Sequence, residues 1–104
     1  SAEAGSLQVA DLILDLKARK VTRAGQQIFL SSKEFAVLEH FINHKGQIVT
    51  RTQLAEHVWD LHFDPMTNVI DVTVYHLREK IDRDFKPQLI HTVRGAGYVL
   101  KVDA

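Results

Sequence analysis

Residues 67–82, TNVIDVTVYHLREKID, contain the side chains with the clearest potential for molecular recognition. On a helix of ~100° per residue, the apolar seam would consist of Ile70, Val74, Leu77 and Ile81. The other faces would present polar, aromatic and β-branched side chains: Asn68, Val72, Thr73, Tyr75, His76 and Arg78. Such side chains can contact base edges, thymine methyl groups and phosphates. The segment is therefore a candidate nucleic-acid contact, although a merely solvated helix face would also be polar.

Two further candidate sites are basic residues beside backbone features that suit phosphate. Thr92 and Arg94 precede the flexible tip 95–97 (Gly-Ala-Gly) of a predicted hairpin, where an arginine can enter a minor groove or bind a phosphate. Arg51 lies one residue inside a predicted helix, whose free N–H groups attract anions. A plain solvent-exposed hairpin and helix are the simpler alternatives.

The residue types and spacings in the sequence give little support for catalysis or metal binding. The sequence contains no nucleophile–base motif and no glycine-rich phosphate loop. It has no cysteine, which excludes disulfides and cysteine-based zinc sites. His40 and His44 have a chelating spacing, but a third ligand is not evident, and Phe41 replaces the glutamate of the H-E-x-x-H motif. We therefore expect no enzyme activity, no metal site and no cofactor.

Composition indicates one ordinary globular domain. The chain has 104 residues, of which 45% are hydrophobic and 25% charged. Thirteen Lys and Arg balance thirteen Asp and Glu, whereas nucleic-acid binders usually carry a basic excess. Any DNA binding must therefore depend on where the charges lie. No membrane-spanning or signal-peptide pattern is evident, and the absence of cysteine fits a cytoplasmic protein.

An N-terminal sheet is expected to precede the helices. Residues 1–6 are small and polar, and we interpret them as a linker or cloning remnant. Residues 7–30 contain brief apolar and β-branched runs separated by charged or glycine breaks, which predicts an antiparallel meander. Ala24 and Gly25 fit a two-residue hairpin turn.

Two capping boxes predict where the first two helices begin. Ser31 with Glu34 predicts a helix over 32–44, which Gly46 would end. Thr50 with Gln53 predicts a short helix over 51–58.

The third helix is predicted over 66–82, with Pro65 suited to its start and residues 59–66 forming the loop before it. Its first half is rich in strand-forming residues, but only a helix accounts for the whole segment. Residues 89–102 predict a terminal β-hairpin. Three helices followed by a hairpin describe an α+β winged helix-turn-helix, within a domain of residues 7–104.

Three separated blocks, TRTQLAEHVW, TNVIDVTVYHLREKID and HTVRGAGYVLKV, resemble the C-terminal effector domain of OmpR/PhoB-type bacterial response regulators. The phrases ARKVTR and LIHTVRGAGY most resemble the heavy-metal-response CusR/CopR subgroup. The resemblance covers about residues 7–102. It implies a four-stranded antiparallel sheet, three helices and a hairpin wing. It also implies sequence-specific binding of double-stranded DNA, with the third helix in the major groove and the wing at the minor groove.

The resemblance also implies residue roles and partners. Base or phosphate contacts are expected from Asn68, Thr73, Tyr75, His76, Arg78, Thr92, Arg94, Arg51 and Trp59. Val72 joins these candidates on the helical-wheel pattern alone. Contacts with RNA polymerase are expected from the loop residues Asp60, Leu61, His62, Phe63 and Asp64. Further expected partners are promoter DNA with direct-repeat half-sites, on which the domain binds as a head-to-tail dimer, and an N-terminal receiver domain.

The expected recognition helix departs from its apparent relatives in charge. Relatives often have two basic residues where this sequence has Tyr75 and His76, and Glu79 adds a negative charge. With fewer cations to release counterions, the isolated domain should bind weakly and depend on dimerisation. His76 would favour binding at mildly acidic pH, where imidazole becomes charged.

Overall fold

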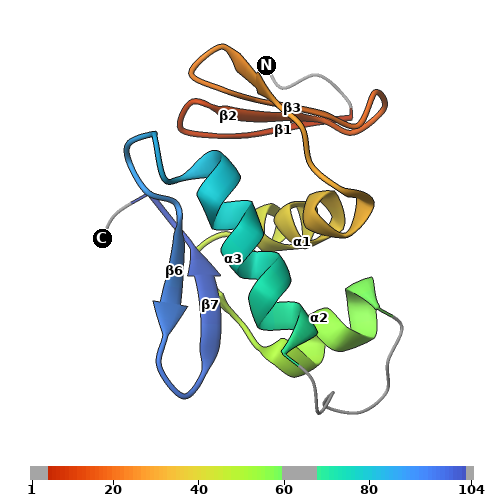
Figure 1. Cartoon of the computed structure of the whole chain (residues 1–104), viewed down its shortest axis with the longest axis vertical. Helices are drawn as coiled ribbons and strands as arrows, with labels where there is room; N and C mark the ends of the chain where they lie inside the picture. Colours follow the sequence, from red (N-terminus) through yellow and green to blue (C-terminus); the bar gives the residue numbers. More distant parts are fainter. Residues whose placement is uncertain (1–4, 60–67, 103–104) are drawn as a thin grey trace.

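The computed structural model describes residues 5–59 and 68–102. A four-stranded sheet comes first, three helices follow, and a β-hairpin ends the chain (Figure 1). Helix α3 runs through the middle of the molecule, with the hairpin along one side and α2 near its beginning (Figure 1). This arrangement is the winged helix-turn-helix predicted from the sequence. No helix in the described ranges is long and apolar enough to cross a membrane.

The N-terminal sheet is the predicted antiparallel meander. Its strands are β1 (Ser6–Val9), β2 (Leu12–Asp15), β3 (Lys20–Arg23) and β4 (Gln26–Ile28), paired in chain order. Ala24 and Gly25 both have positive φ angles, 54° and 79°, as a tight two-residue hairpin turn requires. Strand β1 includes Ser6, because Ser6 pairs with Asp15. The predicted linker 1–6 was therefore too long at this end, and residues 1–4 lie outside the described residues.

Both predicted capping boxes are present and begin their helices at the expected residues. Helix α1 (Ser32–Asn43) begins where Ser31 and Glu34 cap each other, and α2 (Arg51–Val58) begins where Thr50 and Gln53 do the same. The prediction for α1 was one residue too long, because His44 is the C-cap and leaves helical geometry at φ −119°, ψ 35°.

Helix α3 (Val69–Ile81) is shorter than the predicted 66–82. Asn68 is its N-cap residue, and residues 65–67, including the proposed start at Pro65, lie outside the described residues. At the other end, the Asp82 carboxylate accepts hydrogen bonds from the amides of Leu89 and Ile90. The helix therefore ends at Ile81, where the chain turns toward the hairpin.

The C-terminal sheet contains a strand that the sequence did not predict. It consists of β5 (Ile48–Val49), β6 (Ile90–Val93) and β7 (Gly97–Leu100), in the order β5-β7-β6. Gly97 has a φ of 146°, and a Cβ there would lie 2.3 Å from the Val49 carbonyl oxygen. Only glycine allows this close approach. The contact between Gly97 and Val49 therefore holds the hairpin against the residues that precede α2.

The core confirms the predicted apolar seam of α3. The buried side chains of this seam, each at most 1% exposed, are Ile70, Val74, Leu77 and Ile81. They join the buried side chains of α1, β2 and the hairpin in one cluster. The helix face opposite the seam is thereby turned outward.

A buried arginine connects the N-terminal sheet to the end of α3. Arg23 is 0% exposed, and its Nε lies 2.8 Å from Oδ1 of Asp11. Its Nη1 donates to the Ile81 carbonyl oxygen at 2.6 Å and to Asp82 Oδ1 at 2.9 Å, and its Nη2 donates to the Pro87 carbonyl oxygen. These contacts satisfy a buried charge and fix the sheet relative to α3 and the hairpin.

Candidate nucleic-acid interface

The outward face of α3 presents the side chains that the sequence predicted. Val72 is 39% exposed and Tyr75 is 59% exposed, and Asn68 and His76 are also exposed. Thr73 is only partly exposed, and its hydroxyl donates to the Val69 carbonyl oxygen at 2.8 Å. Its hydroxyl proton is therefore used within the helix, which leaves mainly its methyl group and acceptor lone pairs for a ligand.

Among the described residues, the C-terminal hairpin, which we call the wing, is joined to the helical residues Val69–Ile81 of α3 by two side-chain hydrogen bonds. The Tyr98 hydroxyl donates to Asp71 Oδ1 at 2.6 Å, and Arg78 Nη1 donates to the Thr92 hydroxyl at 3.0 Å. Asp71 and Arg78 are seven residues apart, so they lie on one side of α3 about 10 Å apart along its axis. Thr92 and Tyr98 are cross-strand partners in the wing. One pair of wing residues therefore holds two turns of α3.

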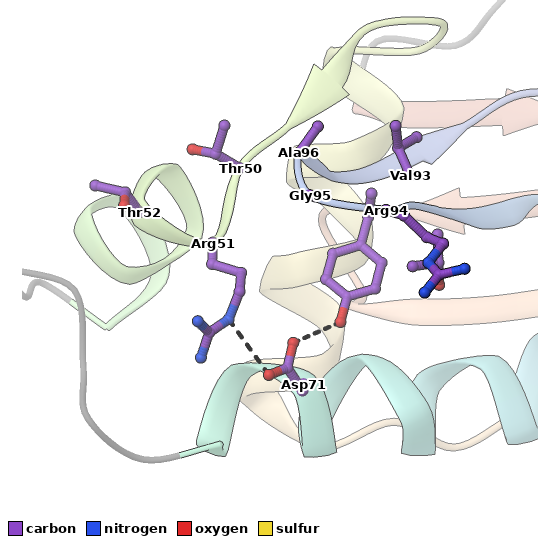
Figure 2. Close-up of a pocket in the computed structure, with 11 residues that line it drawn as sticks. Thr50, Arg51, Thr52, Asp71, Val93, Arg94, Gly95 and Ala96 are labelled. Atoms are coloured by element: carbon purple, nitrogen blue, oxygen red, sulfur yellow. Dashed lines mark hydrogen bonds and ion pairs between the residues drawn. The ribbon is translucent and has the colours of Figure 1, made fainter.

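Asp71 also connects α3 to the beginning of α2. Its Oδ2 lies 3.3 Å from Nε of Arg51. Figure 2 shows Arg51 extending from α2 to Asp71, and the second dashed line from Asp71 is its hydrogen bond to Tyr98. One carboxylate on α3 thus contacts both α2 and the wing.

These elements enclose a hollow of about 400 Å³, which we call the α2–wing hollow. It is lined by residues 50–52 at the beginning of α2, Asp71 of α3 and residues 92–98 of the wing (Figure 2). Arg51 and Arg94 supply positive charge there, and the N–H groups at the beginning of α2 add a positive dipole end. The structure therefore brings together Arg51, Thr92 and Arg94, which the sequence predicted separately.

The electrostatic environment of the hollow changes the pKa of Tyr98. Burial, the hydrogen bond to Asp71 and the negative charge of Asp71 raise the pKa of the Tyr98 phenol to about 12, against smaller opposing effects of Arg51 and Arg78. The hydroxyl is therefore held as a proton donor to Asp71. Sequence reasoning assigned no role to Asp71 or Tyr98, because their pairing spans 27 residues and leaves no local pattern.

Trp59 lies apart from this surface, at the opposite end of α2 from Arg51. It is the C-cap residue of α2 and packs partly against the core. Lys33 Nζ lies 5.7 Å from the centre of its ring and donates to the Val58 carbonyl oxygen at 2.9 Å. The five predicted polymerase-contact residues, 60–64, lie outside the described residues.

A cluster of histidines on α1 and α2 lies away from the α2–wing hollow. The ring centres of His40 and His44 are 4.3 Å apart, and those of His40 and His57 are 5.1 Å apart. Burial, and then the charges of His44 and His57, lower the pKa of His40. Sequence reasoning did not predict that His57 joins the other two. Within residues 5–59 and 68–102, no three His, Asp or Glu side chains are arranged to hold a metal ion.

Comparison with known proteins identifies a family. The family model described as "Transcriptional regulatory protein, C terminal" matches residues 25–100. Transcriptional regulatory protein CusR of Escherichia coli strain K12 is 58% identical over 95 residues, which are 91% of this chain and 42% of CusR. Transcriptional activator protein IrlR of Burkholderia pseudomallei strain 1026b is 49% identical over 100 residues, which are 96% of this chain and 44% of IrlR. The chain thus spans less than half the length of these curated relatives.

Solved structures agree with this result. The DNA binding domain of CpxR from E. coli superposes with a TM-score of 0.83 at 31% identity, covering 95% of this chain and 98% of that chain. The RstA DNA-binding domain of Klebsiella pneumoniae, in complex with RstA box, has a TM-score of 0.84 at 30% identity, covering 94% of this chain and 98% of that chain. These neighbours confirm the predicted fold, and the similarity to CusR confirms the predicted subgroup.

Proposed function

The chain belongs to the family of C-terminal domains of transcriptional regulatory proteins, of the OmpR/PhoB type, and we propose that it binds double-stranded promoter DNA in a sequence-specific way. In this role it is the output domain of a two-component response regulator. Members of this family are regulators, so the chain is not an enzyme.

The observation that carries this proposal is the joined surface of α3 and the wing. Val72 and Tyr75 are exposed on α3 although apolar and aromatic groups gain nothing from facing water. The hydrogen bonds from Tyr98 to Asp71 and from Arg78 to Thr92 hold the wing beside that face. In our proposal α3 enters the major groove, where Asn68, Val72, Thr73, Tyr75 and His76 contact base edges or phosphates.

The wing and α2 supply contacts to the backbone and the minor groove. Arg94, exposed beside the tip of the wing, reaches the adjacent minor groove. Arg51 and the N-terminal end of α2 face a phosphate. Arg78 donates to Thr92 in the free domain, and both side chains become available to phosphate if this hydrogen bond opens. Trp59 provides a backbone contact at the other end of α2.

The partners of the full-length protein follow from the resemblance and remain proposals, because the chain spans 42% of CusR. We infer an N-terminal receiver domain and head-to-tail dimers on direct-repeat half-sites. We also infer a contact between RNA polymerase and the loop residues 60–64. The site of action would be the cytoplasm, where promoter DNA lies.

The proposal is tested by selection from DNA duplexes with a random central segment, followed by titration of the selected duplex. We expect enrichment of direct repeats and an affinity that falls with salt, because each phosphate neutralised contributes about 0.9 to the logarithmic slope. A shuffled duplex of the same composition is the control. Binding without enrichment or salt dependence would favour the alternative, a winged helix that binds only protein.

A further inference from the structure

We propose that Asp71 is a positioning residue for DNA binding, which holds Arg51 of α2 and Tyr98 of the wing against α3 so that all three elements meet DNA as one preformed surface. This inference rests on the proposed function. It concerns a residue that contacts no base or phosphate in the proposal, and whose charge is the wrong sign for DNA.

The negative charge of Asp71 is unfavourable at a surface that binds DNA. Asp71 is partly exposed and lines the α2–wing hollow together with Arg51 and Arg94. A carboxylate on a surface that approaches phosphates repels them. A residue that only faced solvent here would therefore weaken binding, and its presence in the hollow needs a compensating effect.

The geometry supplies that effect. The two carboxylate oxygens of Asp71 contact different elements, Oδ1 the Tyr98 hydroxyl at 2.6 Å and Oδ2 the Arg51 Nε at 3.3 Å. Tyr98 is only 9% exposed, and Gly97 fixes the backbone just before it against Val49. The phenol therefore meets Asp71 from an anchored position, and the carboxylate is held from both sides.

Arg51 gains most from this arrangement. A free arginine side chain has considerable rotamer entropy, part of which is lost when it binds a phosphate. Contact with Asp71 through Nε restricts the side chain before DNA arrives. The loss of entropy is thereby moved from the binding step to folding.

The second connection between α3 and the wing explains why Asp71 also affects orientation. Without Asp71, the hydrogen bond from Arg78 to Thr92 and the bonds of Asp82 to the amides of Leu89 and Ile90 would remain, and all of these lie toward the C-terminal half of α3. The wing would then lose its side-chain connection to the first turn of α3. Since Arg94 lies beside the tip of the wing, its position over the minor groove would change most.

The two possible roles of Asp71 predict opposite signs for Asp71→Asn, which retains the shape and removes the charge. If Asp71 were a bystander, the variant would bind DNA more tightly because a repulsive charge is gone. If Asp71 is a positioning residue, we expect binding about tenfold weaker, because the hydrogen bond from Tyr98 loses its charged acceptor and Arg51 loses its ion pair. Asp84→Asn is the matched control, since Asp84 is exposed on the segment after α3 and its loss changes the net charge equally.

A spectroscopic readout separates positioning from a general loss of stability. In a Tyr75→Phe background, Tyr98 is the only tyrosine, so its ionisation can be followed by ultraviolet absorbance. We expect Asp71→Asn to lower the pKa of Tyr98 from about 12 toward 10, while burial keeps it above 10. Asp84→Asn should leave it unchanged.

Tyr98→Phe provides a second variant that retains the packed ring. We expect it to weaken DNA binding, and Asp71→Asn to add less to Tyr98→Phe than it costs alone. If Asp71→Asn binds the selected duplex as tightly as the parent, or if it leaves the pKa of Tyr98 unchanged, the positioning role is wrong and the proposed function still stands. If the parent domain itself selects no DNA, both proposals are wrong.

Discussion

Arg23 Nη1 in β3 lies 2.9 Å from Asp82 Oδ1 at the C-terminal end of α3, and both side chains are buried. A negative charge at a helix C-terminus is unfavourable by itself, and the guanidinium offsets it. The Asp82 carboxylate also accepts the amide hydrogens of Leu89 and Ile90, which begin the wing. This ion pair therefore determines how the sheet, α3 and the wing are placed relative to one another.

Removing the arginine should destabilise the domain strongly. Arg23→Met fills much of the same volume but leaves Asp82 buried without its counter-charge, and we expect a loss of about 3–5 kcal/mol in the free energy of unfolding. Urea denaturation followed by circular dichroism measures it. Arg83→Met is the control, because Arg83 is mostly exposed and its pair with Glu79 is worth about 0.3–0.5 kcal/mol. Equal losses in the two variants would contradict the structural role of Arg23.

The lowered pKa of Glu34 predicts that the folded domain loses stability in acid. Burial raises the pKa of this carboxyl, but the hydrogen bonds from Lys80 and the Ser31 amide, with the charges of Lys80 and His76, outweigh it and hold the pKa below 4.5. The unfolded state then binds more protons than the folded state, so this stability is present above about pH 4.5 and is lost as the pH falls through the folded pKa. Melting temperatures of the parent and Glu34→Gln, measured between neutral pH and pH 3, should converge in acid. Parallel curves would show that Glu34 does not contribute in this way.

The histidine cluster predicts a second, milder pH effect. The pKa of His40 is lowered from 6.5, chiefly by burial and then by His44 and His57. Between the folded value and 6.5 the unfolded state binds more protons, so stability falls as the pH drops below about 6.5. We expect His40→Gln to flatten the dependence of the melting temperature on pH in this window. An unaltered slope in His40→Gln would exclude the effect.

Gly97 should not tolerate a side chain. Gly97→Ala would place a methyl group 2.3 Å from the Val49 carbonyl oxygen at a φ of 146°, so the wing must move, at a cost of about 3 kcal/mol or more. Gly95→Ala tests the contribution of φ alone, since φ is 76° there and no atom lies within 4 Å of the added Cβ. Thermal unfolding of both variants measures the difference. A smaller loss for Gly97→Ala than for Gly95→Ala would contradict the close approach.

Alanine substitutions of two proposed DNA-contact residues should change DNA binding in different ways. Arg94→Ala removes a positive charge near the wing tip, so we expect weaker binding to all duplexes and a salt slope reduced by about 0.9. Tyr75→Ala removes an exposed ring from α3, and we expect a changed sequence preference with a nearly unchanged salt slope. Titrations against the selected and shuffled duplexes distinguish the two. Negligible effects of both variants would refute these residue assignments.

Local features of the fold were predictable because their causes are local in the chain. The capping boxes at Ser31 and Thr50 fixed two helix starts, since each involves residues only three apart. The spacing of Ile70, Val74 and Leu77 indicated the buried face of α3, and therefore also the exposure of Tyr75. The order of sheet, helices and hairpin also followed from these local patterns, and the known structures confirm it.

The tertiary structure alone decided how these elements are joined. Strand β5 has two residues, too few to show a period, and exists because β7 pairs with it. Arg23 with Asp82, and Asp71 with Tyr98, pair charged or polar groups that are 59 and 27 residues apart. Such pairs leave no pattern in the sequence, because either partner alone resembles an ordinary surface residue. Only folding brings them together, since burying one of them without the other would leave an unsatisfied polar group.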